Sequence, residues 1–366
     1  MNILVAMNAF KGTLSSVDVN EIVKNHFESL NHEVLSIPIS DGGDGFLDAI
    51  SKGLEGNFVE VEVFDPLNRT IKEKIFMIKD KAYIELAKVS GLNLLSKEEQ
   101  NPLNTSTYGL GIMIKQAIYI GAKHIYIGAG GSATHDCGIG MLQALGVRFY
   151  HHGKLIDEKL CGKHLSLITS FDLSHLEDLI EYIDFEVITD VKNTLLGDQG
   201  AAHIYAKQKG ASKEDITFLE KATKHFADIV EEYKNENFRD NDGSGAAGGI
   251  GFGFLSFLDA TLHSGIEFMI DLLHIEEAIK KVDLIIVGEG KLDQQTIYGK
   301  APYGIAKIAK KHQKKVIGIF GIKDDLKDND FLDETYVIVP KYASNDLSMN
   351  HPKQALLNML KKVFTS

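Results

Sequence analysis

The sequence offers little that would bind nucleic acid, cross a membrane or form disulfide bonds. Its 366 residues carry 39 lysines and arginines against 51 aspartates and glutamates, and the net charge of -12 disfavours a polyanionic partner. No apolar run approaches the roughly 18 residues of a membrane-spanning helix, and no basic stretch precedes the first apolar run. Two cysteines, Cys137 and Cys161, are too few for a disulfide framework. We therefore expect a cytoplasmic protein with no membrane or nucleic-acid partner.

Familiar kinase and metal signatures are missing as well. The nearest match to the GxxxxGK[ST] phosphate loop, Gly299-Lys300, is followed by Ala301 and has no upstream glycine in register. Neither an HRD nor a DFG motif occurs, and the 14 histidines show no HExxH spacing. Phosphate chemistry in this chain would therefore need another scaffold, and no zinc site is predicted.

Short apolar runs alternate with segments of helical spacing, which predicts an α/β fold. The length suggests two domains at roughly 100 to 200 residues each. We expect residues 1–65 plus 275–366 to form a Rossmann-like domain with a doubly wound parallel sheet. Its five predicted strands cover residues 3–6, 34–39, 283–287, 315–320 and 336–339. Residues 66–274 would form an inserted α/β domain with antiparallel or mixed strands and the large glycine-rich loop, since alternation runs from Phe58 to Leu86.

Glycine is concentrated in four clusters, at residues 41–45, 128–140, 243–253 and 288–293. Residues 128–133 match GxGxxA after a predicted strand, but the acidic residue expected about 20 positions later in a dinucleotide site is missing. The same residues could bind an anion at a helix N-terminus through backbone N–H groups, Ser132 and Thr134, or form a tight strand-to-helix turn. For residues 243–253 we favour close helix packing.

Charged residues follow the predicted strands. Asp41 and Asp44 could hold Mg²⁺ or cap a turn, and Lys11 could reach a phosphate or be a solvated surface charge. Asp190 follows another strand, and Glu289, Lys291 and Asp293 follow a third. Phosphoryl transfer to a hydroxyl needs a metal held by carboxylates, a cation, a base and glycine-rich amides. The pattern favours that chemistry.

Five motifs together resemble the bacterial glycerate kinases of the ATP-dependent type I class. They are FKGTLS (10–15), DGGDG (41–45), NPLNTSTYGLG (101–111), GGSATHDCGIGMLQALG (130–146) and GEGKLDQQTIYGKAP (288–302). The resemblance covers nearly the whole chain. It implies a kinase that transfers the γ-phosphoryl group of ATP to D-glycerate with Mg²⁺, giving ADP and 2-phosphoglycerate or 3-phosphoglycerate, on two α/β domains.

The resemblance and the strand-end pattern select the same candidate residues. We expect catalytic roles for Lys11, Asp190 and Asp293, metal binding by Asp41 and Asp44, and phosphate or substrate binding by Gly130, Gly131, Ser132, Thr134, Asp136, Glu289, Thr296 and Lys300. We hypothesise that Asp190 or Asp293 accepts the proton of the attacking hydroxyl. The chain departs from the family at Asn8-Ala9 (usually Asp-Ser), His135 (Asn), Cys137 (Gly) and Thr194 (Pro).

Two other functions compete with the kinase. An NAD-dependent dehydrogenase of a small hydroxy acid would use residues 128–133, and a non-catalytic sensor would bind a sugar acid between two lobes. Several points stay open: the hydroxyl phosphorylated, the domain that binds ATP, and whether the chain forms a homo-oligomer. The cation for the substrate carboxylate is also open, among Lys192, Lys209, Lys291, Lys300 and an arginine.

Overall fold

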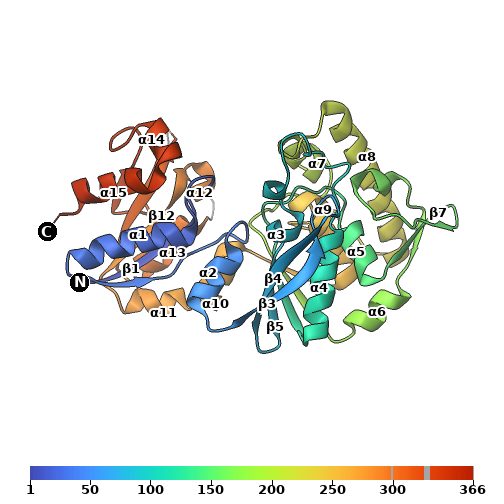
Figure 1. The fold of residues 1–366 in the computed structure, drawn as a ribbon, viewed down its shortest axis with the longest axis horizontal. Coiled ribbons are helices and arrows are strands. Elements are labelled where there is room, and N and C mark those ends of the chain that lie inside the picture. Colours follow the sequence, from blue (N-terminus) through green and yellow to red (C-terminus); the bar gives the residue numbers. More distant parts are fainter. Residues whose placement is uncertain (298–299, 325–329, 366) are drawn as a thin grey trace. The chain divides into compact units, whose positions relative to one another are not determined.

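The fold was obtained as a computed structural model, which describes residues 1–297, 300–324 and 330–365. The chain divides into two compact units (Figure 1). Unit 1 comprises Met1–Asp41, Gly45–Glu55 and the described residues from Ser264 onward, and unit 2 comprises Gly42–Asp44 and Gly56–His263. The sequence pattern places boundaries near residues 65 and 275, whereas the units divide after Glu55 and before Ser264. The difference arises because the strand at residues 57–64 pairs within the sheet of unit 2.

Unit 1 contains a parallel sheet of five strands within the described part of the chain, in the order β14-β13-β12-β1-β2. The strands are β1 (Asn2–Met7), β2 (Glu33–Ser36), β12 (Leu284–Leu292), β13 (Lys315–Lys323) and β14 (Glu334–Val337). β1 pairs with β12 from Ile3 opposite Leu284 to Met7 opposite Gly288. After its first residue β1 is buried, as expected for a strand covered on both faces. The predicted five-stranded parallel sheet is confirmed.

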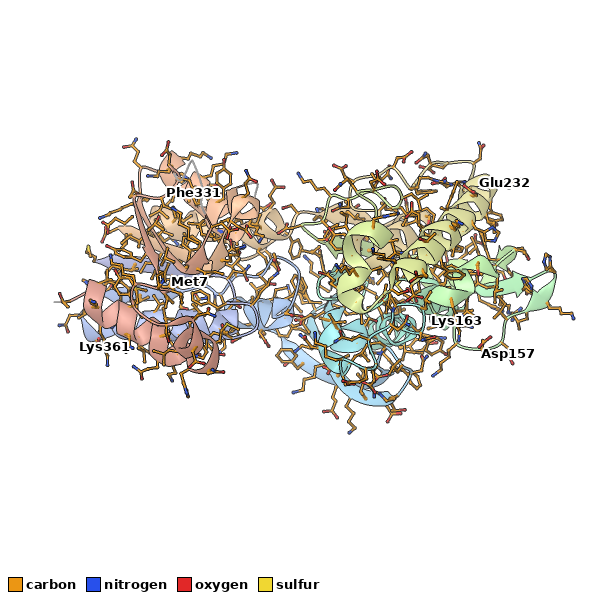
Figure 2. The ribbon with its side chains drawn as sticks, turned by 90° about the horizontal axis from the view of Figure 1, so that it is seen from above. Met7, Asp157, Lys163, Glu232, Phe331 and Lys361 are labelled. Carbon is orange, nitrogen blue, oxygen red and sulfur yellow. The ribbon has the colours of Figure 1, made fainter. Side chains whose placement is uncertain are left out.

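Unit 1 also contains helices, some of which contact its sheet through buried apolar residues. They are α1 (Ser16–Ser29), α2 (Phe46–Gly53), α10 (Gly265–Leu272), α11 (Ile275–Lys280), α12 (Gln294–Ile297), α13 (Ala301–Lys311), α14 (Asn345–Asn350) and α15 (Pro352–Val363). The N-terminus of α1 is capped, since the Ser15 hydroxyl accepts a hydrogen bond from the Asp18 N–H. Figure 2 shows Met7 inside this unit and Lys361 of α15 at its surface, matching their burial.

Unit 2 is built on a mixed sheet with the order β11-β10-β6-β5-β4-β3, six strands among the residues described. The strands are β3 (Asn57–Phe64), β4 (Thr70–Ile78), β5 (Lys81–Glu85), β6 (His124–Gly128), β10 (Asp184–Ile188) and β11 (Thr261–His263). β3, β4 and β5 are antiparallel, which confirms the strand type predicted from the alternation, while β5, β6, β10 and β11 run parallel. A small second sheet joins β7 (Arg148–His151), β8 (Lys154–Leu155) and β9 (Ser170–Asp172).

The helices of unit 2 surround a core of its own. They are α3 (Ala87–Ser90), α4 (Tyr108–Ile120), α5 (Ile139–Leu145), α6 (Ser174–Ile180), α7 (Ala201–Tyr205), α8 (Lys213–Lys234) and α9 (Ala246–Leu258), with 3-10 turns η1 (Leu92–Leu94), η2 (Gly162–Ser166) and η3 (Lys207–Lys209). Close packing of residues 243–253 is confirmed, because a Cβ at Gly251 would overlap the carbonyl of Gly243. Among the described residues, no helix has both the length and the apolar character needed to cross a bilayer.

Candidate active site

The strand ends of unit 1 bring Lys11 and Asp41 together. Lys11 follows β1, and the chain after β2 continues along β1 because the N–H groups of Ile37 and Ile39 donate to Val5 and Met7. This pairing carries Asp41 to the carboxyl edge of the sheet, where open α/β sheets bind ligands. The Lys11 ammonium donates to Asp41 Oδ2 at 3.2 Å. The predicted cation and one predicted metal ligand therefore form an ion pair.

Four more predicted residues gather at the end of β12. The Thr296 hydroxyl donates to Glu289 Oε1 at 2.7 Å, and the Thr296 N–H donates to Asp293 Oδ1 at 3.2 Å. Lys300 Nζ lies 3.8 Å from Glu289 and 3.9 Å from Asp293. We call these four residues with Lys11 and Asp41 the edge cluster. Gly299, next to Lys300, lies outside the described residues.

The electrostatics of the edge cluster centre on Glu289, which is 5% exposed. Burial raises the pKa of Glu289, while Lys300 and the Thr296 hydrogen bond lower it. The carboxylates of Asp41 and Asp293 raise that pKa further, so Glu289 feels both of these negative charges. The edge therefore holds an excess of negative charge that a bound cation would relieve.

Two buried polar groups at this edge were not predicted. Asn8 directly follows β1 and donates its N–H to Gly288 O, which places it beside Glu289. Its side-chain Nδ2 and the hydroxyl of Ser40 are buried with no hydrogen-bond partner among the described residues. The departure from the family at Asn8 was the only sequence signal for this position, and Ser40 had none.

In unit 2, residues 42–44 pack directly against the loop in the glycine cluster at residues 128–140, which we call the glycine-rich loop. The Gly130 N–H donates to Gly42 O at 3.0 Å, and a Cβ at Gly130 would overlap the Cα of Gly43. A Cβ at Gly131 would lie 2.7 Å from Asp44 Oδ1, and Gly131 has a φ of +70°. Asp44 Oδ2 in turn accepts a hydrogen bond from Asn93, a residue that the sequence reasoning missed. Close backbone approach explains why glycine occupies these positions.

The glycine-rich loop also rests on a buried lysine. Lys209 Nζ donates to Ser132 Oγ and to Thr134 O, both at 2.7 Å, and Lys209 is 2% exposed. Burial lowers the pKa of Lys209 to about 7, although Asp136 opposes the shift. The sequence alone marks Lys209 only as one of several possible cations for the substrate carboxylate.

The helix that follows this loop begins later than expected. The prediction that residues 128–133 form a tight strand-to-helix turn or lie at a helix N-terminus is wrong, because α5 starts only at Ile139. Asp136 is fully buried, and its carboxylate accepts hydrogen bonds from Thr107 and from the N–H groups of Gly138 and Gly140. Thr134 is also fully buried and its hydroxyl lacks a partner among the described residues. Both residues hold the loop from inside.

The departures at His135 and Cys137 lie in this interior. His135 Nε2 is 3.1 Å from the Thr223 hydroxyl, and burial lowers the pKa of His135 to about 3, so its ring is neutral at physiological pH. Cys137 has a φ of +50°, in the left-handed region that glycine adopts most readily. That backbone accounts for the glycine usual in the family at this position.

The remaining predicted residue, Asp190, is exposed just after β10. It belongs to unit 2, as does Asp44, whereas Asp41 and Asp293 belong to unit 1. No group of three or more His, Cys, Asp or Glu side chains is close enough to hold a metal within residues 1–297, 300–324 and 330–365.

Comparisons with known proteins agree with this arrangement. A family model described as "Glycerate kinase family" matches residues 3–366. The chain belongs to the glycerate kinase family. A glycerate kinase of Halalkalibacterium halodurans is 38% identical over 355 residues, 95% of this chain and 93% of that protein. A glycerate 2-kinase of Escherichia coli K12 is 38% identical over 332 residues, 89% of this chain and 87% of that protein.

The chain also resembles a solved structure in its fold. A crystal structure from Salmonella typhimurium LT2, assigned to glycerate kinase 2, superposes with a TM-score of 0.84 at 35% identity. It covers 99% of this chain, which covers 96% of that one. The two-domain α/β fold and the membership of an enzyme family are thereby confirmed. No finding favours the dehydrogenase or the sensor.

Proposed function

We propose that this glycerate kinase transfers the γ-phosphoryl group of ATP to a hydroxyl of D-glycerate in the cytoplasm, giving ADP and 2-phosphoglycerate or 3-phosphoglycerate. The edge cluster carries the proposal, because it places two cations, Lys11 and Lys300, among carboxylates where parallel strands end. The name of the Escherichia coli relative, glycerate 2-kinase, makes the 2-hydroxyl the first position to test.

The side chains of the site divide the work of phosphoryl transfer. Lys11 stabilises the negative charge of the transferred group, and Asp190 or Asp293 accepts the proton of the attacking hydroxyl. Glu289, Thr296 and Lys300 bind substrate or phosphate in unit 1, and Gly130, Gly131 and Ser132 do so in unit 2. Thr134 and Asp136 support that loop from its buried side.

A divalent cation completes the proposed site. Asp41 and Asp44 would hold Mg²⁺, whose charge neutralises phosphate oxygens of ATP when it is bound. The negative charge around Glu289 supports a cation at the edge in unit 1, since Asp41 and Asp293 both raise the pKa of Glu289. Lys11, already paired with Asp41, holds that carboxylate in place.

The direct test is ADP release from Mg-ATP with a panel of small hydroxy acids that includes both glycerate enantiomers. We expect ADP release that depends on D-glycerate, and ³¹P NMR of the product then identifies the phosphorylated hydroxyl. Turnover with another acid but not with D-glycerate would overturn the substrate assignment. No turnover with any acid, combined with nicotinamide binding seen by fluorescence, would support the dehydrogenase instead.

A further inference from the structure

Lys209 places an ionisable amino group in the interior of unit 2. It ends the turn η3, and the next residue, Gly210, has a φ of +95° and packs so closely on Gln100 that a Cβ would overlap the Gln100 carbonyl. The turn is therefore fixed, and the lysine points into unit 2 with 2% of its surface exposed. Burying an ammonium group is costly unless other groups compensate its charge.

The protein compensates the positive charge of Lys209 only in part. In the described chain, the hydrogen bonds of Nζ go to two neutral acceptors, Ser132 Oγ and Thr134 O. The carboxylate that acts on Lys209 belongs to Asp136, whose oxygens already accept hydrogen bonds from Thr107, Gly138 and Gly140. An ammonium has three donors and no acceptor, so the site could take further negative charge.

The geometry gives Ser132 a defined direction. When Lys209 is protonated it can only donate, so Ser132 Oγ accepts this hydrogen bond, and the proton of the serine hydroxyl is left to donate elsewhere. Ser132 is 8% exposed and directly follows the exposed Gly131, so this serine lies next to the exposed part of the loop. The neighbouring residue is held on both sides, since the Ala133 N–H donates to Ser90 O and Ala133 O accepts from Thr105.

We propose that Lys209 is a positioning residue that fixes and polarises the Ser132 hydroxyl as a donor to an anionic oxygen of a ligand, either a nucleotide phosphate or the carboxylate of the hydroxy acid. The inference rests on the proposed function and names the source of positive charge behind the glycine-rich loop. An anion bound at Ser132 adds the negative charge that the protein interior does not provide near the Lys209 ammonium.

A pH dependence of binding follows from this arrangement. With its pKa lowered to about 7 by burial, Lys209 is about half protonated in the free protein near neutral pH. Affinity for the anion is highest below pH 7 and falls as the pH rises, because the anion must then bring a proton into the site. The facing titratable groups are Asp136 and His135, which are buried, and Asp44, which packs against Gly131.

The test measures binding without turnover, by titration calorimetry from pH 6 to 8.5. The ligands are a non-hydrolysable ATP analogue with Mg²⁺ and, separately, D-glycerate. We expect Lys209→Met and Ser132→Ala each to weaken one ligand about tenfold, and the double variant to be no weaker than Lys209→Met alone. The loss of affinity with rising pH should disappear in Lys209→Met. The ligand affected identifies the anion as phosphate or as carboxylate.

Matched variants separate this role from mere support of the fold. Lys207→Met changes an exposed lysine of the same turn and should leave both affinities and the pH dependence intact. A folded Lys209→Met with both affinities within twofold of wild type, or with the pH dependence retained, would overturn the proposal. So would additive losses in the double variant. If Lys209→Met fails to fold, an unchanged affinity of Ser132→Ala for both ligands overturns it.

The binding experiment and the ADP-release experiment can fail separately. Absence of ADP release in the wild-type protein would refute glycerate phosphorylation, while the binding measurements would still decide whether Lys209 and Ser132 act together on an anion.

Discussion

The Lys11 side chain is 68% exposed, yet its ammonium donates to a carboxylate that is 15% exposed. A surface ion pair of this kind contributes little to the free energy of unfolding, so the stability of the fold does not depend on it. We expect Lys11→Ala to lower kcat by about 10²- to 10³-fold, typical of losing one donor to transition-state charge, with the KM for D-glycerate changed less than threefold. Steady-state kinetics measure both constants.

The control for Lys11 is Lys315→Ala, since Lys315 is the first residue of β13, at the opposite end of the parallel strands, and pairs with Glu334 at 2.6 Å. It should leave kcat unchanged. A raised KM with normal kcat in Lys11→Ala would mean that this lysine binds substrate and transition state equally.

Asp190 and Asp293 are the two candidates for the base. Replacing each by Asn keeps the shape and, at Asp293, keeps an oxygen that can accept the Thr296 N–H. We expect one of the two variants to lose at least about 100-fold in kcat and the other to stay near wild type. Pre-steady-state measurement of ADP formation separates chemistry from product release. Wild-type turnover in both variants would end the hypothesis that either carboxylate is the base.

Single residues show where sequence reasoning succeeds and where it stops. Lys11, Asp41 and Glu289 stand out in the sequence because each follows an apolar run, and parallel strands bring such ends together. Asn8 and Ser40 do not, because their burial depends on strands paired across the sheet. Lys209 lies far along the chain from Ser132, so nothing local marks their hydrogen bond.

Two loops in unit 2, residues 42–44 and the glycine-rich loop, meet backbone against backbone. Gly130→Ala forces a Cβ onto the Cα of Gly43, where neither backbone can yield cheaply. We expect a loss of about 1 to 3 kcal/mol in the free energy of unfolding, measured by urea denaturation, with weaker ligand binding at the loop.

Gly121→Ala provides the matched comparison. Gly121 has a φ of +107°, but a Cβ there meets nothing within 4 Å. This variant should cost about 1 kcal/mol from backbone strain alone and leave ligand binding unchanged. Equal ligand affinities in the two variants would mean that the contact between the loops has no part in binding.

The helices and strands follow the hydrophobic pattern, while the loop after β6 does not. Apolar runs predict β1, β12 and β13 because central parallel strands are buried on both faces. The GxGxxA motif led to a misplaced helix start, since Asp136 ties the chain to Thr107 before α5 can begin. Tertiary hydrogen bonds of that kind leave no periodic trace in the sequence.

Each unit has its own apolar core. Buried side chains such as Leu110, Ile127 and Phe226 cluster in unit 2, and others such as Val5, Phe27 and Leu356 cluster in unit 1. Most of unit 2 is one continuous segment, residues 56–263. We expect that fragment to fold alone, with cooperative thermal unfolding followed by circular dichroism. A broad, non-cooperative melt would show that its core needs the rest of the chain.

Unit 1 has the opposite construction, because its strand β1 lies between β2 and β12, which are separated in the sequence by the whole of unit 2. The ribosome therefore makes β1 long before it makes β12, one of the two strands that pair with β1. Lys11 and Asp41 leave the ribosome early, whereas Glu289 and Lys300 leave it late. The edge cluster consequently forms only when translation is nearly finished, and under the proposed function an incomplete nascent chain would have no kinase activity.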